Sequence, residues 1–143
     1  MPHLVILYTG QLDHEVDMTA LCRQMADAML TVKDEDGKQV FPTGGTRVLA
    51  YPAPHYAVAD GGAAGLAAAG TGDYAFVYLN LRMGRGRSPA TQQRAGQTLS
   101  DVTQAFFAPV LAQRHIGITL QIDEGPEVFD AKHSNLHPLF NKA

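Results

Sequence analysis

Apolar and polar residues follow two different periods along this chain, and together they predict four strands and two long helices. The largely apolar run at residues 3–8 is typical of a strand buried on both faces. From Asp17, a favourable N-cap, apolar residues recur at helical spacing and predict an amphipathic helix. The predicted buried face of this helix consists of Leu21, Met25, Ala28 and Met29.

The next segments predict a charged loop at residues 33–38 and a second strand at residues 46–50. A continuation of this strand through Pro52 and Pro54 cannot lie in the middle of a sheet, because proline has no N–H to donate. The Ala/Gly-rich stretch at residues 61–70 is of low complexity. It fits either a mobile loop or a short Ala-rich helix.

The second half of the chain repeats the strand–helix–strand pattern. Residues 73–82 predict a strand, and Ser88 with Pro89 predicts the N-cap and first position of a long helix. Pro109 is expected to kink the last turns of this helix. Residues 116–122 alternate between apolar and polar and predict a half-buried strand. The predicted buried stripe of the helix is Ala95, Leu99, Val102, Phe106 and Val110.

The C-terminal tail, residues 129–140, has no regular period. We expect it to be irregular and to be held by Leu136, Leu139 and Phe140 as apolar anchors.

These elements predict an α+β fold, in which two β-α-β units form a four-stranded sheet with two helices on one face. The whole chain, residues 1–143, fits a single domain. The opposite sheet face then needs cover. Charged residues make up 17% of the chain, below the average of about 25%, so we expect a homo-oligomer.

Composition narrows the possible compartments and partners. A net charge of −3 argues against nucleic acid as a partner. The single cysteine, Cys22, excludes an internal disulfide and suits a reducing compartment; its neighbours indicate a buried apolar residue rather than a nucleophile. With no signal-like N-terminus and no apolar run near 18 residues, we expect a cytoplasmic protein without a membrane partner.

Pro2 is the first candidate for chemistry. Removal of Met1, which we expect because a small residue follows, would leave a free secondary amine at the start of a strand. An ordinary α-amino group titrates at about 7.7–8.0, and the ring fixes its direction, so Pro2 is suited to general base catalysis. With Met1 attached, Pro2 is an amide with no basic nitrogen. Many chains also carry proline at position two for no chemical reason.

The segment 84–88, Gly-Arg-Gly-Arg-Ser, is the second candidate. Backbone amides at a helix start, flanked by arginines, suit a small anion. Pro89 stands where a dinucleotide fingerprint needs its third glycine, so a nucleotide is not indicated. A turn with exposed arginines is the alternative. His133 and His137 have the spacing of a metal pair but no third ligand, and we interpret them as packing or surface residues.

A set of short motifs is spread along most of the chain. These motifs are Pro2-His3, Phe41-Pro42, Gly45, Arg47, Ala59-Asp60-Gly61, Asp73-Tyr74-Ala75-Phe76-Val77, Gly84, Gly86-Arg87-Ser88, Gln93, Ala95-Gly96, Asn135, His137 and Leu139-Phe140. On these residues the chain resembles the 5-carboxymethyl-2-hydroxymuconate isomerase family of the tautomerase superfamily, and residues 73–96 are the most specific block. Two segments depart from the resemblance: the loop at 32–40 looks longer, and residues 62–70 look inserted.

This resemblance implies that Pro2 is the catalytic acid–base group and that Arg47 and Arg87 bind substrate carboxylates. It also implies a homotrimer with sites near subunit boundaries. The implied reaction is isomerisation of an unsaturated 2-hydroxy or 2-oxo di- or tricarboxylate in aromatic catabolism, without metal or cofactor. Two alternatives stay open: a non-catalytic oligomeric protein that binds a small anion, and a tautomerase-fold enzyme that hydrates or dehalogenates another substrate.

Overall fold

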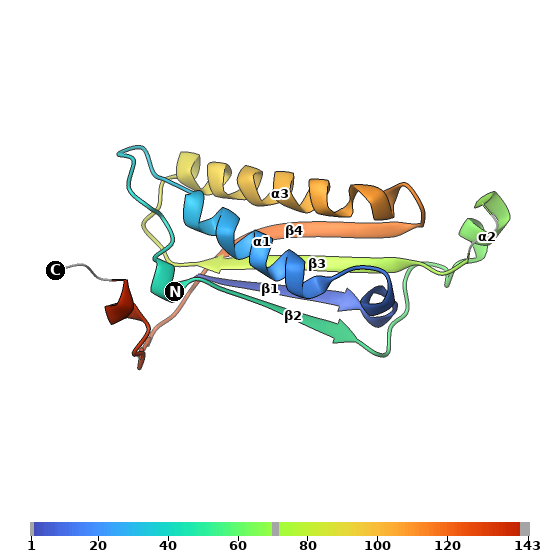
Figure 1. Cartoon of the computed structure of the whole chain (residues 1–143), viewed down its shortest axis with the longest axis horizontal. Coiled ribbons are helices and arrows are strands. Elements are labelled where there is room, and N and C mark those ends of the chain that lie inside the picture. The colour runs from blue at the N-terminus through green and yellow to red at the C-terminus, as the bar shows by residue number, and fades with distance from the viewer. Residues whose placement is uncertain (1, 70–71, 141–143) are drawn as a thin grey trace.

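The computed structural model describes residues 2–69 and 72–140 and contains one four-stranded sheet (Figure 1). The strand order is β2-β1-β3-β4, with β1 parallel to β2, β3 parallel to β4, and the central pair β1 and β3 antiparallel. This topology is that of two β-α-β units joined side by side, so the predicted α+β fold is confirmed. The strands are β1 (His3–Thr9), β2 (Arg47–Ala53), β3 (Ala75–Met83) and β4 (Ile116–Glu124).

Two long helices cover one face of the sheet. Helix α1 (Met18–Thr31) packs against β2, and α3 (Pro89–Leu111) packs against β4 and against α1 (Figure 1). Both begin where the sequence predicts. The Asp17 carboxylate accepts a hydrogen bond from the Ala20 N–H at 3.0 Å, and the Ser88 hydroxyl accepts one from the Thr91 N–H at 3.1 Å. Each cap satisfies an amide that has no partner within its helix.

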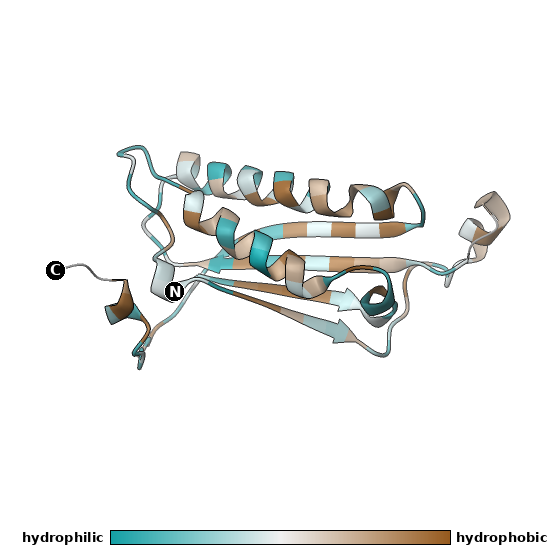
Figure 2. Cartoon of the chain, in the orientation of Figure 1, coloured by the Kyte–Doolittle hydropathy of each residue, from teal (hydrophilic) through white to brown (hydrophobic). Residues whose placement is uncertain are grey.

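The apolar core lies between this helix layer and the sheet. Alternate residues of the central strands point into it, including Leu4 and Ile6 from β1 and Leu79 and Leu81 from β3. Figure 2 shows the corresponding apolar positions along the strands and helices. Because successive side chains of a strand face opposite ways, the residues between them lie on the uncovered face.

The prediction that the second strand does not continue through Pro52 in the middle of the sheet is confirmed, whereas its predicted end at residue 50 is wrong. Strand β2 runs through Pro52 to Ala53, beyond the predicted end at residue 50. It is nevertheless an edge strand, paired only with β1 in the described sheet. Because β2 has a neighbouring strand on one side only, the missing N–H of Pro52 does not break a hydrogen bond to a second strand.

The buried stripe of α3 differs from the predicted one. Ala95 and Leu99 are buried as expected, whereas Val102, Phe106 and Val110 are only partly buried. The helix instead buries Thr103 and Phe107, one position further along each turn. Thr103 is tolerated inside because its hydroxyl donates to the Leu99 carbonyl at 2.7 Å.

Two regions that the sequence left uncertain have definite forms. Residues of the low-complexity stretch form a short helix, α2 (Ala63–Ala69); Gly70 lies outside the described residues. The tail is irregular as predicted, with one short 3-10 turn, η3 (His137–Leu139). The expected apolar anchors are wrong for the single chain, because all three are exposed. They are Leu136, Leu139 and Phe140.

Candidate active site at the N-terminal end of the sheet

Pro2 lies at one end of the sheet, where β1 and β2 begin and β3 and β4 end (Figure 1). His3, the next residue, pairs with Arg47 on one side and with Arg82 on the other. Extending both registers by one residue puts Pro2 between Thr46 and Met83. The alternation of side chains places it on the helix-covered side with Leu4, and Pro2 is buried.

Arg47 sits beside this position but on the opposite face of the sheet. It opens β2 and shares the uncovered face with its pairing partner His3. Its guanidinium reaches the Gly45 carbonyl at 3.5 Å, in the short 3-10 turn η2 (Thr43–Gly45) that precedes the strand. Arg47 is therefore next to Pro2 along the sheet and projects to the other side of it.

Two guanidinium groups flank His3 on the uncovered face. Partial burial of the ring and the positive charge of Arg47 lower the pKa of His3 below its usual 6.5, and Arg82 acts in the same direction. Asp130, from the C-terminal tail, acts weakly the other way. The lowered pKa disfavours a charged His3 ring, so Arg47 and Arg82 are the main positive groups beside it.

Arg87 reaches the same end from the loop between β3 and α3. Its Nη1 donates to the Gly84 carbonyl at 3.1 Å, one residue beyond Met83, and its Nη2 donates to the Val40 carbonyl at 3.0 Å. The guanidinium also lies 5.8 Å from the centre of the buried Phe41 ring. Arg87 thus bridges the end of β3 to the loop that leads into β2.

The expected anion site at the start of α3 is taken by a carboxylate of the chain itself. Glu35, from the charged loop, accepts hydrogen bonds from the Ser88 hydroxyl and, at 3.1 Å, from the Thr91 hydroxyl. The Ser88 hydrogen bond is the main cause that lowers the pKa of Glu35. Glu35 shares a hollow of about 390 Å³ with Arg85 and Arg87.

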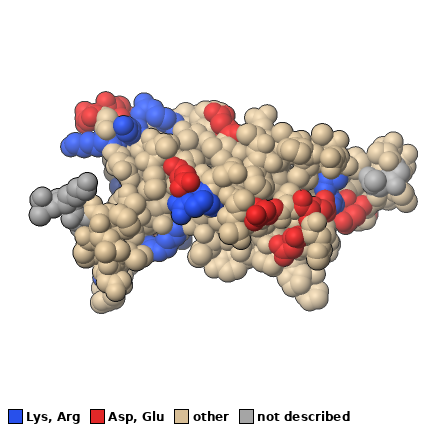
Figure 3. All heavy atoms as spheres, viewed as in Figure 1, with Lys and Arg blue, Asp and Glu red and all other residues tan. Residues whose placement is uncertain are grey.

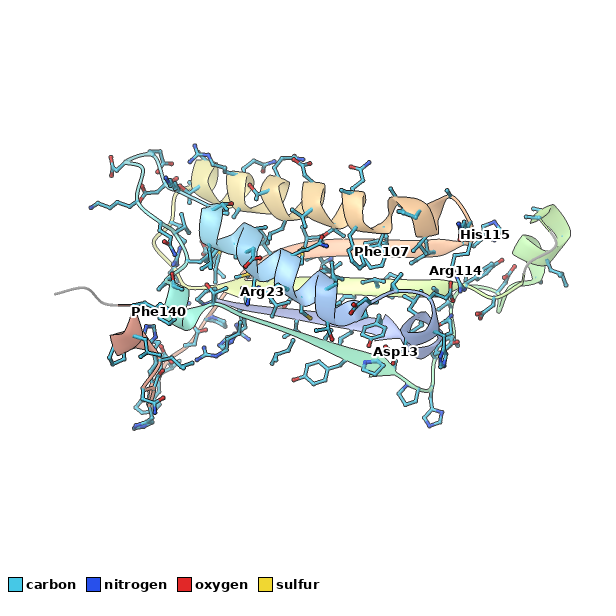
Figure 4. All side chains as sticks on the ribbon, in the orientation of Figure 1. Asp13, Arg23, Phe107, Arg114, His115 and Phe140 are labelled. Atoms are coloured by element: carbon cyan, nitrogen blue, oxygen red, sulfur yellow. The ribbon has the colours of Figure 1, made fainter. Side chains whose placement is uncertain are left out.

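The charge of the molecule is distributed unevenly along the sheet. On the face shown in Figure 3, most Lys and Arg lie toward the end that carries Pro2, next to a group of Asp and Glu, whereas Asp and Glu predominate at the other end. At that far end, where Figure 4 labels Arg114, the Arg114 guanidinium forms ion pairs with Glu15 and Asp73. On this face, the Pro2 end is therefore the less negative end of the molecule.

A further hollow of about 440 Å³ borders the Pro2 end, because Thr46, the residue beside Pro2, lines it together with Thr43 and Phe140. The hollow of about 660 Å³ between β1 and α1 includes Tyr8, Asp13 and Cys22. Burial and the 2.6 Å hydrogen bond to Asp13 raise the pKa of Tyr8 to about 12. Cys22 is half-buried rather than fully buried as expected, and burial raises the pKa of its thiol, which disfavours the reactive thiolate.

Sequence reasoning missed Glu35 and Arg82. Arg82 was visible as the last polar residue of a predicted strand, whereas nothing local indicated that Glu35 would reach a helix 53 residues away.

The two histidines with the spacing of a metal pair lie in different surroundings. His133 is exposed and His137 packs beside Gly44, where a methyl group would lie 2.9 Å from the His137 Cα. Within residues 2–69 and 72–140, no three His, Cys, Asp or Glu side chains gather as a metal site. No helix there is long and apolar enough to cross a membrane.

Comparison with known proteins gives consistent matches. A sequence model of the family described as 5-carboxymethyl-2-hydroxymuconate isomerase matches residues 2–140. The chain is 26% identical over 140 residues to the 5-carboxymethyl-2-hydroxymuconate Delta-isomerase of Escherichia coli, covering 98% of this chain and 99% of that protein.

Solved structures agree with these sequence matches. A 5-carboxymethyl-2-hydroxymuconate delta-isomerase structure is 66% identical with a TM-score of 0.96, covering 100% of this chain and 95% of the other. An isomerase of the same description from Deinococcus radiodurans R1 is 31% identical with a TM-score of 0.80, covering 99% and 95%. A fused 4-OT asymmetric trimer, 15% identical with a TM-score of 0.53 over 97% and 99%, shares the fold.

Proposed function

Since this chain belongs to the 5-carboxymethyl-2-hydroxymuconate isomerase family, and is a tautomerase-type isomerase, we propose that its substrate is an unsaturated 2-hydroxy or 2-oxo carboxylate such as 5-carboxymethyl-2-hydroxymuconate. Pro2 moves the proton, and no metal or cofactor takes part. The observation that carries the proposal is the burial of Pro2 at the arginine-rich end of the sheet, between β2 and β3.

The proposed reaction consists of two proton transfers, one from the substrate to Pro2 and one from Pro2 to the substrate. The neutral Pro2 nitrogen takes a proton from an enol oxygen or a carbon of the substrate, leaving a dienolate. The resulting ammonium returns the proton to the far carbon of the conjugated system. One O–H or C–H bond breaks and one C–H bond forms, so the sum is a 1,3 or 1,5 shift without any redox change.

The surroundings of Pro2 suit this role electrostatically. Burial and nearby guanidinium groups both disfavour an ammonium ion, so the amine is expected to be neutral at working pH. Arg47 and Arg87 are proposed to hold the substrate carboxylates and to stabilise the dienolate charge. Arg87 lies on the helix-covered side of the sheet and Arg47 on its uncovered side, so the two arginines would bind different carboxylates of the substrate.

The proposed assembly is a homotrimer in which the uncovered sheet face packs against other copies. Residues Leu7, Leu49 and Tyr51 on that face are each nearly half exposed in the single chain. A contiguous apolar patch of this kind is typical of a protein interface. Because Arg47 projects onto this face, the assembly would place it at a subunit boundary, close to where the substrate binds.

The test is an intact mass followed by two N-terminal variants. A mass lacking one methionine is expected, showing that Pro2 carries a free amine. Pro2→Ala is expected to lower kcat/KM by about 10²- to 10⁴-fold, the contribution of a positioned acid–base group. A second variant with lysine inserted between Met1 and Pro2 keeps the ring but leaves it an amide, and is expected to be inactive.

The outcomes separate the alternatives. Retained methionine in an active wild-type protein, or full turnover by both variants, would overturn the role of Pro2. Binding of a dicarboxylate with no turnover would favour the anion-binding protein. Hydration or dehalogenation that depends on Pro2 would favour a tautomerase-fold enzyme with another substrate.

A further inference from the structure

The charged loop before β2 is an ordered hairpin rather than a loose connection. Lys33 and Gln39 form an antiparallel bridge, and the Asp34 N–H donates to the Lys38 carbonyl at 2.8 Å. The Asp34 carboxylate accepts two further backbone hydrogen bonds within the hairpin, each at 2.9 Å. At its base the Val40 N–H donates to the Val32 carbonyl at 2.9 Å. The Val40 carbonyl is therefore fixed to a small rigid unit, residues 32–40, here called the hairpin.

Helix α3 holds this hairpin at two points. Glu35 binds the hydroxyls of Ser88 and Thr91 in the first turn, and Thr91 is 1% exposed. One turn later the Arg94 guanidinium donates to the Lys33 carbonyl at 2.7 Å. Of these contacts, only that of Glu35 joins a hairpin side chain to the start of the helix, next to Arg87.

Arg87 completes the connection. Its Nη2 donates to the Val40 carbonyl at 3.0 Å, while its Nη1 is tied to Gly84 at the end of β3. The orientation of the guanidinium therefore depends on where the hairpin lies, and the hairpin lies where Glu35 and Arg94 hold it. From this chain of contacts we propose that Glu35 is a positioning residue that orients Arg87 for a substrate carboxylate, an inference that rests on the proposed function.

A carboxylate in this hollow has two opposite effects on an anionic ligand. It repels a second carboxylate, since Glu35 and Arg87 line the same space of about 390 Å³. It also holds the hairpin through two hydroxyl donors, and a hydrogen bond to a charged group is worth more than a neutral one. The repulsion is screened at this exposed position. Arg85, which lines the same hollow, and Arg94, whose charge acts on Glu35, offset it, whereas the Asp34 carboxylate in the hollow adds to it.

These two effects predict opposite changes when the carboxylate is removed. If Glu35 positions Arg87, Glu35→Ala raises KM by about threefold to tenfold with kcat nearly unchanged, because substrate and transition state lose the same contact. Glu35→Gln is expected to stay near wild type, since its amide oxygen can still accept from both hydroxyls. Asp36→Asn, in the same hairpin and exposed, is the matched control and should change neither constant.

A double-mutant cycle with Arg87→Ala completes the test. In the Arg87→Ala background, Glu35→Ala is expected to add no further rise in KM, because the residue it positions is gone. A lower KM for Glu35→Ala would show that Glu35 acts as a competing anion, and an additive effect would show that it acts independently of Arg87; either result overturns the proposal.

A failure of the proposed function would give a different result from a failure of the positioning role of Glu35. If Arg87→Ala itself leaves KM unchanged, the assigned substrate role of Arg87 fails. Amide hydrogen exchange then tests the mechanical step alone: Glu35→Ala should speed exchange at Val40 and Gly37, whose amides are bonded within the hairpin, and Asp36→Asn should not.

Discussion

His3 reports directly on the electrostatics of the Pro2 end. Its ring lies between Arg47 and Arg82, and its pKa is lowered by partial burial and by Arg47. An NMR titration of the imidazole should show a transition below 6.5. Arg47→Ala removes a positive neighbour, so it should raise the pKa of His3 while burial keeps it below the usual value.

Arg23→Ala is the control for this titration. Arg23 is an exposed cation on α1 that pairs with Asp27, so its loss should leave His3 unaffected. A His3 transition that stays in place when Arg47 is removed would mean that Arg47 does not control the field around Pro2.

The residues of the site differ in how far the sequence could predict them. Pro2 and Arg47 are tied to strand starts, and strand alternation predicts their neighbours once the pairing is known. The two contacts of Arg87 and the reach of Glu35 to Ser88 depend on tertiary pairing across 47 and 53 residues. No local pattern encodes such a pairing, because it depends on where two loops end after the sheet has formed.

The two adjacent phenylalanines of α3 test the corrected buried stripe. Phe107 is 0% exposed, whereas Phe106 is only partly buried against the same core. Phe107→Ala should therefore destabilise the protein by about 3–5 kcal/mol, the usual cost of emptying a buried aromatic site. Phe106→Ala, the matched control, should cost clearly less, measured by urea unfolding with an unchanged m value.

A larger loss for Phe106→Ala than for Phe107→Ala would mean that the stripe predicted from apolar spacing, with Phe106 inside, is the correct one. The prediction of the buried stripe from the sequence is wrong for a physical reason. Thr103 is polar, and its hydroxyl is accepted inside because it donates to the Leu99 carbonyl and also contacts the Met25 sulfur. Strand β2 shows the same kind of limit, since Pro52 is compatible with a strand only because β2 is at the edge.

The molecule as a whole leaves apolar surface that its own chain does not cover. The sequence predicted a four-stranded sheet covered on one face, since hydrophobic period determines which elements form. It did not predict the path of the tail, which has no period. The segment after β4 begins at Gly125, which is hydrogen-bonded to Met83 and Arg85, and it leads into the tail, where η3 packs on η2 at Gly44. Between these two attachments Val128 and Phe129 are almost fully exposed.

A segment attached at both ends with apolar side chains in solvent is best explained by a neighbouring copy. If the proposed trimer buries Val128 and Phe129, the double variant Val128→Ser/Phe129→Ser loses about 1.5–3 kcal/mol of burial per side chain. Its subunit dissociation constant should then rise more than about tenfold, since 1.4 kcal/mol is a factor of ten. Light scattering over a dilution series measures this dissociation constant, with Leu66→Ser, at an exposed residue of α2, as the matched control.

Unaltered assembly of the double variant, or a monomeric wild type, would contradict the proposal. Because neither side chain is buried in the single chain, a loss of assembly without loss of helix signal would identify the tail as part of the interface rather than of the fold.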